Sequence, residues 1–578
     1  MTDTTSPSAA ASSPSAEGPT PSPARVPARA WAALAALSLG LFMIVFDVSI
    51  VAVAVPAMAR ALDADLTSVV WVTSAYLLAY VVPMLFTSRL GDRYGPKRVF
   101  VAGLVVFTAA SLGSGLSGTV GMLIAARTVQ GFGAALLTPQ TLTLITHLFP
   151  GGERGRAMGV LGGVSALAGV TGPLLGGILV DGLGWQGIFY VNVVVGAAAL
   201  ALSLRVIPDV RPGRAHRFDL VGIVLSGSGL FLVVFGVQNG RTHDWGPLIG
   251  PFTVPQTIAA GVFLLAAFLI TQARAGSGRD REPLLPLAVF ADRGFAAGTA
   301  VTVVLGFAMT GMLLPLIVHL QDALGLSPTA AGLVTAPMAL VSGVLAPLTG
   351  RLSDRVGGRP LLAAGLLVMA LGLALIAVRM APGVPAVQLV PGLLLTGAGM
   401  GLVLVPVNSV AMGTVPAEQR GAASGVFFTG RQLGSVLGSA ATGVLLQVRI
   451  SVRVADEART AAGHLPARHR PGFLASLRDA AESGQTGGAP PRLLPGGLPA
   501  RLLPQAQDLA SQALHAGLAR AAADTLLMTA AVLLVGLPAA FAVRTATRSR
   551  TARDSHSRTA KDSRSRTTKD PRSRTTKD

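Results

Sequence analysis

Asp47 is the residue whose surroundings in the sequence most strongly suggest a chemical role. It stands in the run MIVFDVSIVAVAVP (43–56), where almost every other residue is apolar. Arg127 stands in a second apolar run, LIAARTVQGFGAALLTP (123–139), with Gln130 and Gly131 on the same helical face. Burial favours the neutral carboxyl, and a nearby guanidinium favours the carboxylate. Moving between these two influences would let Asp47 take up and release a proton, so Asp47 and Arg127 are candidate proton-coupling residues.

The composition indicates the environment of both runs. Of 578 residues, 51% are apolar and 13% are charged, and the mean hydropathy is +0.61. Apolar stretches of about 20 residues recur along the chain, which is the length a membrane helix needs. A membrane barrel would instead show strands of about ten residues with alternating polarity. The sequence therefore predicts an all-α polytopic membrane protein.

Fourteen membrane spans are predicted, and the start of each span gives the depth of Asp47 and Arg127 in the membrane. Asp47 lies 17 residues after Ala30, roughly 25 Å into a hydrocarbon core about 30 Å thick. The span that holds Arg127 starts at Thr119 on the outer face, and Arg127 lies about 12 Å below that face. The two side chains therefore have comparable depth and are placed to pair. A fixed ion pair that only holds two helices together is the alternative. The predicted spans are 30–55, 68–90, 97–118, 119–148, 155–182, 185–207, 218–239, 254–275, 293–321, 327–350, 359–380, 386–413, 419–447 and 522–544.

Basic residues predict the orientation in the membrane. Lys and Arg gather in alternate short loops, from the cluster at 89–98 to Arg420, whereas the opposite loops hold only Arg60, Arg241 and Arg379. Because short basic loops stay in the cytoplasm, both termini are expected there, in a multi-pass protein of the cytoplasmic membrane. By helix parity the long loop 448–521 is expected outside the cell.

Two similar segments predict an internal repeat. SRLGDRYGPKRVF (88–100) follows the second span, and GRLSDRVGGRPLL (350–362) follows the tenth. Two six-helix halves would separate these loops by roughly 200 residues, and the larger spacing fits two helices inserted between the halves. The expected divisions are a disordered N-terminal tail (1–29), a six-helix bundle (30–207), two inserted helices with linkers (208–292), a second six-helix bundle (293–545) and a basic repetitive tail (546–578).

The repeated loops resemble the loop motif of the major facilitator superfamily, G-x-L-x-D-R-x-G-R-K. Ser88 and Pro96 depart from it in the first copy. Such charges can interact with helix ends and neighbouring carboxylates and so latch the cytoplasmic ends in one state. The resemblance thus implies a cytoplasmic gate, formed by Asp92, Arg93, Asp354 and Arg355. The simpler alternative is that these charges only mark the cytoplasmic side.

GVTGPLLGG (169–177) resembles the antiporter motif that this superfamily associates with proton-coupled exporters. Gly172, Pro173, Gly176 and Gly177 provide a kinked, smooth helix surface that another helix can approach closely. FDVSIVAVAVP, GWQGIFYVNV (184–193) and RQLGSVLG (431–438) resemble motifs of the fourteen-helix drug:proton antiporters. The resemblance implies an exporter of hydrophobic drugs or antibiotics that works by alternating access and is driven by proton influx.

Deep polar residues indicate the substrate class less directly. Two deep arginines against one carboxylate favour a neutral or anionic hydrophobic compound over a permanent cation. His319 and Asp322, near the end of the ninth span, form either a secondary proton or substrate site or a solvated pair. The candidate cavity residues are Gln130, Asn192, Met309, Asn408 and Arg431.

Other classes of function fit the sequence less well. Eight scattered histidines show neither metal-ligand spacing nor a nucleophile-base arrangement, so no enzyme, metal or cofactor is expected. The net charge of +19 follows from cytoplasmic loops and tails, so it predicts contact with the bilayer and not with nucleic acid. The expected partners are a small hydrophobic substrate, protons and lipid. A proton-linked importer or metabolite transporter of the same fold remains the main alternative, ahead of a membrane-embedded enzyme.

Overall fold

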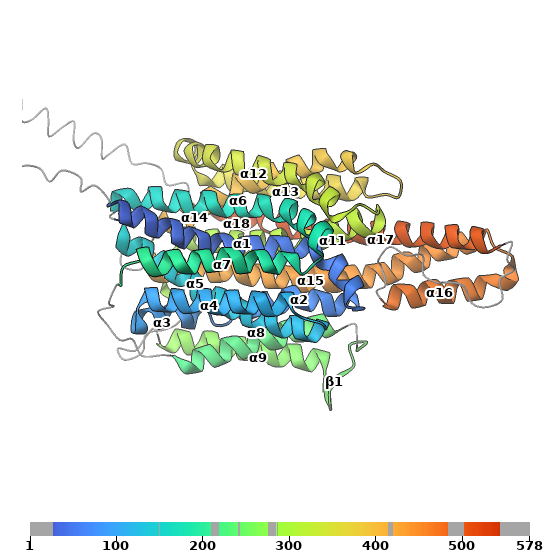
Figure 1. The fold of residues 1–578 in the computed structure, drawn as a ribbon, viewed down its shortest axis with the longest axis horizontal. Helices are drawn as coiled ribbons and strands as arrows, with labels where there is room; N and C mark the ends of the chain where they lie inside the picture. The colour runs from blue at the N-terminus through green and yellow to red at the C-terminus, as the bar shows by residue number, and fades with distance from the viewer. Residues whose placement is uncertain are drawn as a thin grey trace, which may run out of the picture.

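The protein is a bundle of long helices that run in nearly one direction (Figure 1). The structure is a computed structural model and describes residues 27–149, 151–209, 219–240, 243–275, 285, 287–413, 415, 420–483 and 502–543. In chain order the elements are α1 (Ala28–Ala61), α2 (Leu66–Val81), α3 (Met84–Tyr94), α4 (Pro96–Gly115), α5 (Val120–Leu148), α6 (Gly151–Leu183), α7 (Gly187–Val206), α8 (Leu220–Asn239), β1 (Pro247–Ile249), β2 (Phe252–Thr253), α9 (Val254–Ala275), η1 (Leu287–Ala291), α10 (Arg293–Gly311), α11 (Leu313–Val318), η2 (His319–Ala323), α12 (Pro328–Val356), α13 (Gly358–Arg379), η3 (Ala386–Leu389), α14 (Val390–Gly413), α15 (Arg420–Ala462), η5 (Ala467–His469), α16 (Arg470–Ser483), α17 (Leu503–Val535) and α18 (Leu537–Ala542).

The prediction of an all-α polytopic membrane protein is confirmed. Within the described residues, thirteen helices are long and apolar enough to cross a membrane. The remaining predicted span, 68–90, is divided near Pro83 into α2 and α3, which leaves a shorter apolar helix over Ser68–Val81. Proline lacks the backbone donor that would continue the helix, so a break at this point is expected. Counted as one crossing, α2 and α3 bring the total near the predicted fourteen.

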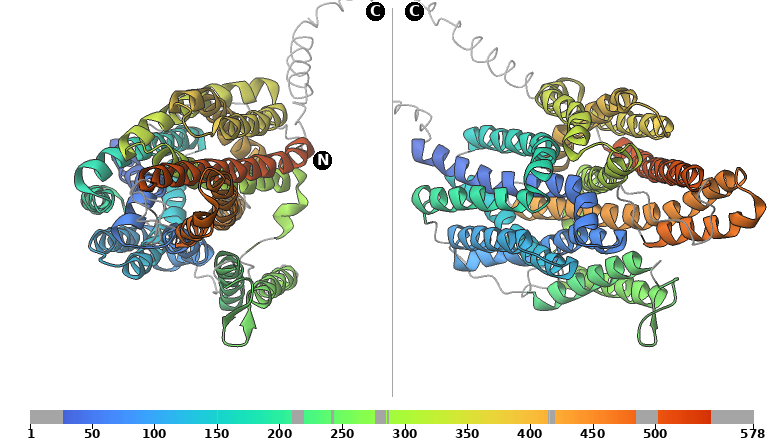
Figure 2. Two further views of the ribbon diagram at one scale, coloured as in Figure 1. Left: turned by 90° about the vertical axis from the view of Figure 1, so that its right-hand side faces the viewer. Right: turned by 45° about the vertical axis from the view of Figure 1, so that its right-hand side comes forward.

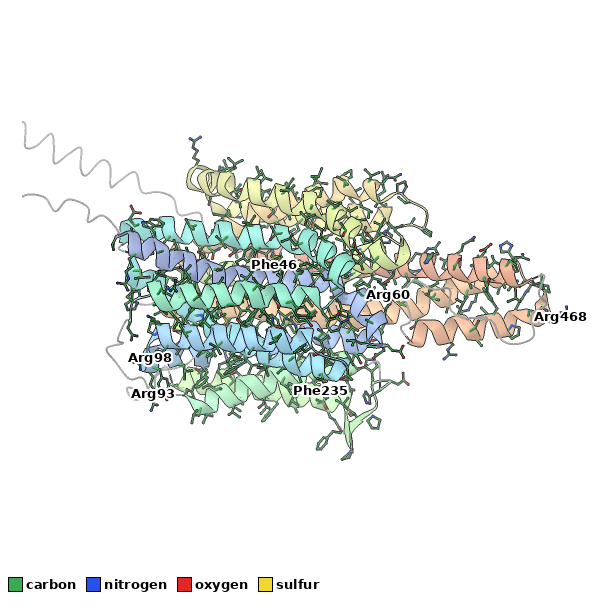
Figure 3. The ribbon with its side chains drawn as sticks, viewed as in Figure 1. Phe46, Arg60, Arg93, Arg98, Phe235 and Arg468 are labelled. Carbon is green, nitrogen blue, oxygen red and sulfur yellow. The ribbon has the colours of Figure 1, made fainter. Side chains whose placement is uncertain are left out.

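The helices pack into two bundles. In the first bundle, α1 packs on α6 and α7, and α5 packs on α2 and α4. In the second bundle, α10 packs on α15, while α13 packs on α14 and α17. Separate apolar cores fill the two bundles, and α6 with α12 forms the main contact between them. We call the end that carries Arg93 and Arg98 the basic end, and the opposite end, from which α16 projects, the α16 end (Figure 3).

The two similar sequence segments form similar turns at the basic end. Gly95 ends α3 with φ = +94°, and Gly357 ends α12 with φ = +86°. Both angles fall in the range that L side chains rarely adopt, so glycine stops each helix without strain. The next helix then starts at once, at Pro96 in the first bundle and at Gly358 in the second.

The hairpin of α8 and α9 lies against the side of the two bundles, with the short β1–β2 hairpin at its tip (Figure 2). Its buried Gln238 donates a hydrogen bond from Nε2 to the Ser74 hydroxyl of α2. That hydroxyl lies 3.1 Å from the Ser439 hydroxyl of α15. The hairpin is therefore bonded to the first bundle at the point where α2 meets the second.

The segment 448–521, expected as a loop, is largely helical where the structure describes it. α15 continues to Ala462, α16 covers Arg470–Ser483, and α17 starts at Leu503. Apolar residues repeat at helical spacing along this part of α15, and they bury Phe473 and Leu477 of α16 in a small core of their own. The Arg, Pro and Gly content of the segment obscured this pattern. The three helices project beyond the bundle as one unit, the α16 unit (Figure 1).

Candidate functional site

Asp47 lies inside the first bundle with no exposed surface. Its Oδ2 accepts a bond of 2.5 Å from Arg127 Nη1 of α5, and its Oδ1 accepts bonds from Gln130 Nε2 at 2.9 Å and Asn192 Nδ2 at 2.8 Å. Both oxygens are thus occupied by donors from α5 and α7. Phe46, the residue before Asp47, marks the level of this network near the middle of the bundle (Figure 3). We call Asp47, Arg127, Gln130 and Asn192 the Asp47 network.

Arg127 is the largest fully buried side chain of the described residues. Besides Asp47, its Nη1 bonds Gln130 Oε1 at 2.8 Å, and its Nε bonds the Val72 carbonyl oxygen at 3.3 Å. The guanidinium also lies over the Tyr76 ring, 4.1 Å from the centroid. Arg127 Nη2 and the Tyr76 hydroxyl are buried without a hydrogen-bond partner. The charges of Asp47 and Arg127 therefore balance each other in the network, while Arg127 Nη2 and the Tyr76 hydroxyl remain free to donate hydrogen bonds in a different arrangement.

The sequence around Arg127 explains how α2 comes so close. At Gly131, a Cβ atom would collide with the Tyr76 carbonyl oxygen, so only glycine allows α5 and α2 to touch there. Since Gly131 follows Arg127 by one helical turn, the same contact brings Val72 and Tyr76 of α2 to the guanidinium. Ser111 of α4 completes the shell, because its hydroxyl accepts from Gln130 Nε2 at 2.8 Å.

The predicted glycine surface of α6 contacts helices of both bundles. Gly172 and Gly176 lie against Ser49 and Ile50 of α1, and a Cβ at either position would collide with those residues. Gly177 lies equally close to the backbone of Pro328 and Thr329 at the start of α12. The Pro173 carbonyl lies against Gly332, also on α12. Two residues of the predicted antiporter motif, Gly172 and Gly176, thus pack within the first bundle, and the other two, Pro173 and Gly177, lie where the first bundle meets the second.

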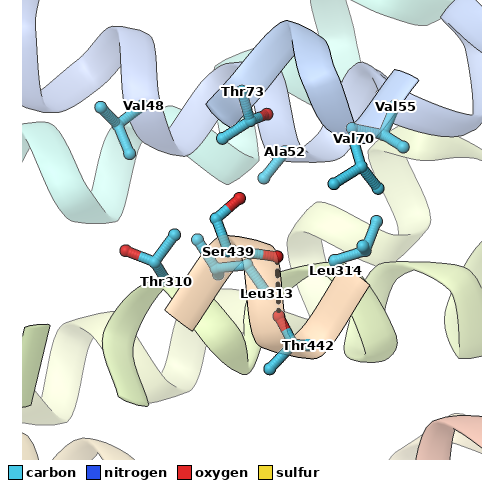
Figure 4. A pocket seen from close by; sticks show the side chains of 10 residues that line it. All are labelled: Val48, Ala52, Val55, Val70, Thr73, Thr310, Leu313, Leu314, Ser439 and Thr442. Atoms are coloured by element: carbon cyan, nitrogen blue, oxygen red, sulfur yellow. Dashed lines mark hydrogen bonds between the residues drawn. The ribbon is translucent and has the colours of Figure 1, made fainter. Parts of the chain in front are cut away.

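A small cavity of about 30 Å³ lies between the bundles (Figure 4). Its volume would fit only a water molecule or two and is far too small for a drug-sized compound. Every lining residue is apolar or carries a hydroxyl group. The lining residues are Val48, Ala52 and Val55 of α1, Val70 and Thr73 of α2, Thr310 of α10, Leu313 and Leu314 of α11, and Ser439 and Thr442 of α15.

The five predicted cavity residues are separated in the structure. Gln130 and Asn192 belong to the Asp47 network and are not among the residues that line this cavity. Met309 and Arg431 are half-buried neighbours in the second bundle, with Arg431 Nη2 at 3.8 Å from the Met309 sulfur. Asn408 is exposed on α14 and bonds the Leu404 carbonyl oxygen at 3.0 Å.

The predicted gate residues lie at the basic end. The side chains of Asp92 and Asp354 fall outside the described residues. Arg93 is exposed and stacks over the Tyr94 ring at 5.6 Å from the centroid, and Arg355 is exposed at the end of α12.

Tyr76, Ser111 and Val72 complete the site without having been singled out from the sequence. Serine is common where membrane helices pack, so residue type alone gives no signal for Ser111. Val72 and Tyr76 share one face of α2 by their i to i+4 spacing, but nothing in the sequence pairs that face with Arg127. Within the described residues, no three His, Asp or Glu side chains are placed to share a metal ion.

A family model described as the Major Facilitator Superfamily matches residues 37–291 and 297–455. The uncharacterised MFS-type transporter Rv1250 of Mycobacterium tuberculosis (strain ATCC 25618 / H37Rv) is 44% identical over 399 residues, covering 69% of this chain and 67% of that one. The tetracenomycin C resistance and export protein of Streptomyces glaucescens is 34% identical over 445 residues, covering 76% and 79%. A solved bacterial homologue of the human lysosomal transporter Spinster, inward-facing and unoccupied, has a TM-score of 0.58 at 16% identity, covering 90% of this chain and 99% of that one.

Proposed function

Because the chain belongs to the major facilitator superfamily and is a membrane transporter, we propose that it exports hydrophobic compounds from the cell in exchange for protons. The observation that carries the proposal is the Asp47 network, a buried carboxylate with donors on both oxygens, built on the helix that also lines the cavity between the bundles. Export is the direction named for the tetracenomycin C relative. The name of this relative and the resemblance of 169–177 to the antiporter motif therefore both favour efflux over uptake.

The basic end is the cytoplasmic end in this proposal, and the α16 end faces the exterior. At the α16 end the bundles are in close contact, since Thr329 N bonds Asp181 Oδ2 at 3.0 Å and Gly177 lies against α12. Toward the basic end, Gly169 and Gly343 continue the same helix faces with open space where a Cβ would stand. This difference supports a state closed to the exterior, in which compounds arrive from the cytoplasm.

Proton binding at Asp47 requires its donors to leave. In the present arrangement three donors occupy the carboxylate, and a proton on either oxygen would compete with at least one of them. Loss of the carboxylate charge leaves Arg127 with an uncompensated buried charge, which is costly and favours a new position for its side chain. The free Nη2 and the Tyr76 ring give the guanidinium other partners on α2.

Movement at Asp47 reaches the transport path through α1. Val48 and Ala52 of α1 line the cavity, while Ser49 and Ile50 lie against the α6 glycines. A shift of α1 that accompanies protonation therefore moves one cavity wall and the helix that closes the α16 end. The apolar and hydroxyl-bearing side chains where the bundles meet fit an uncharged hydrophobic compound, and the half-buried Arg431 of the second bundle fits an anionic one. The proposed substrates are therefore uncharged or anionic hydrophobic compounds.

The test measures proton release from energised inside-out vesicles when hydrophobic antibiotics, with tetracenomycin C among them, are added. The parent protein should respond, and Asp47→Asn should abolish the response. Asp63→Asn is the matched control, because it makes the same chemical change at an exposed loop residue. An undiminished response of Asp47→Asn, with Asp63→Asn also active, would remove Asp47 from proton coupling.

The same variants separate export from import. Intact cells that carry the parent protein should accumulate less of the compound than cells without it, and collapse of the proton gradient should cancel that difference. Higher accumulation with the parent protein would instead establish a proton-linked importer.

A further inference from the structure

A second buried charged group joins the two bundles at the α16 end. Asp322 lies in η2, a π-helical turn after α11, and its side chain is 2% exposed. Arg60, at the end of α1, places Nη1 at 3.5 Å from Asp322 Oδ1 and keeps 41% of its own side chain exposed. This ion pair therefore has one buried member in the second bundle and one solvated member in the first.

The same turn carries further polar groups without partners. Gln321 Nε2 donates to the Val53 carbonyl oxygen of α1 at 2.9 Å, while Gln321 Oε1 is buried and has no partner. His319 is 1% exposed, and its Nδ1 is also buried without a partner. Buried polar atoms without partners are uncommon in folded proteins and raise the free energy of the closed arrangement.

Among the described residues that pack on η2, Arg60 is the charge that Asp322 contacts. On α17, Arg520 pairs with Glu457 and Asp524 pairs with Arg453, both toward α15. Asp508 and His515 of α17 are exposed. The stretch of α12 from Pro328 to Thr349 and all of α11 contain no ionisable residue. Asp322 and His319 are thus the titratable groups that this interface buries.

We propose that Asp322 is a second proton-binding group, which exchanges Arg60 for a proton when the bundles separate at the α16 end. Separation moves Arg60 away with α1, while α11, α12 and α17 of the second bundle stay packed on η2. The carboxylate thus loses its partner and keeps its apolar surroundings from the second bundle. A proton from the adjacent aqueous phase then binds a carboxylate oxygen and removes that charge, and it returns to water when Arg60 comes back. Opening takes up one proton, so lower pH favours the open state.

The proposal adds to the proposed function, on which it rests, an external site for the incoming proton. Opening that takes up one proton changes the ratio of open to closed molecules by up to about tenfold per pH unit. The Asp47 network lies in the middle of the first bundle, so the two carboxylates serve different stages of the cycle. Asp322 controls closure on the outside, and Asp47 controls coupling within.

The experiment follows the opening directly, without substrate or gradient. The chain has no cysteine, so Leu183→Cys and Leu333→Cys place one spin label on α6 and one on α12, both at exposed positions. Double electron–electron resonance in lipid nanodiscs then measures the distance between the two labels, and hence the fraction of open molecules, between pH 9 and pH 5. We expect this fraction to rise as the pH falls in the parent protein, and to become independent of pH in Asp322→Asn and in Arg60→Gln.

Two variants identify the responsible group. His319→Gln should keep the pH response, and Asp322→Glu should retain a response with a shifted midpoint, which also shows that the site tolerates substitution. A response that persists in Asp322→Asn, or that only His319→Gln removes, would overturn the proposal. Because this readout needs no transport, it can fail while Asp47→Asn still abolishes antiport, and the reverse also holds.

Discussion

Asp47 and Val48 are neighbours on α1, yet their side chains lie in different parts of the protein. The Asp47 carboxylate bonds Arg127 at 2.5 Å inside the first bundle, whereas Val48 lines the cavity between the bundles. Consecutive helical residues point about 100° apart, so one turn of α1 contacts both the Asp47 network and the cavity between the bundles. Any rotation or shift of α1 must change both together.

The Asp47 network predicts a specific pattern of stability. Arg127→Gln or Asp47→Asn alone leaves one buried charge without its partner, and each should cost about 3 kcal/mol of unfolding free energy. The double variant restores charge balance and should be more stable than Arg127→Gln alone. Unfolding in mixed micelles, for the parent protein and all three variants, gives the coupling energy between the two sites.

Additive losses in the double variant would contradict this prediction. They would mean that the pair contributes no more than the separate packing of its two side chains. Asp63→Asn again serves as the control for the loss of a carboxylate at an exposed position.

Gly131→Ala should weaken the contact of α5 with α2. Its Cβ would collide with the Tyr76 carbonyl oxygen, and overpacking of this kind typically costs about 1–3 kcal/mol. Since the same contact holds α2 against Arg127, coupled transport should fall along with stability. Gly121→Ala is the matched control on the same helix, because a Cβ there meets nothing within 4 Å. A melting temperature as low for Gly121→Ala as for Gly131→Ala would show a general effect of alanine in α5.

Gly177→Ala should favour the open α16 end. Its Cβ would collide with the backbone of Thr329 on α12, so the two bundles can no longer approach as closely. The label pair at positions 183 and 333 should then report a larger open fraction at every pH. Gly163→Ala on α6 faces open space and should leave the distance unchanged. An unchanged distance in Gly177→Ala would place the closing contact elsewhere.

Sequence reasoning located the charged pair because depth in a membrane follows from residue counts. The arithmetic placed Asp47 and Arg127 at one level, and the structure puts them in contact. Depth does not give the rotation of a helix about its axis, however. Gln130 and Asn192 were therefore predicted as cavity residues, and the structure shows that both donate hydrogen bonds to Asp47 inside the first bundle.

The same limit applies to contacts between distant segments. Arg60 and Asp322 lie 262 residues apart, and no periodic pattern links them. Their pairing depends on how the two bundles meet, which is set by the glycine contacts of α6 and α12. The helices themselves were predictable, because an apolar run of about 20 residues in lipid must satisfy its own backbone hydrogen bonds.

Gln238→Leu should loosen the attachment of the α8–α9 hairpin. The variant removes the donor to Ser74 while keeping a side chain of similar size, and loss of a buried hydrogen bond costs about 1 kcal/mol. Ser439→Ala removes the hydroxyl that bonds Ser74 on its other side. If the three residues act as one network, the double variant should lose less stability than the sum of the single losses. Strict additivity would show that Gln238 acts on Ser74 alone.

The α16 unit should unfold independently of the membrane bundles. Phe473 and Leu477 are fully buried against Ala458 and Ala510, in a core separate from those of the two bundles. Phe473→Ala removes the largest side chain of that core and should cost about 3 kcal/mol of its local stability. Hydrogen exchange should then accelerate in 455–483 and 503–515, whereas the helices around Asp47 should keep their protection. Val452→Ala, at an exposed position of α15, is the control. Faster exchange that extends into α1 or α5 would show that the α16 unit stabilises the transport core itself, since both regions would then open as one cooperative unit.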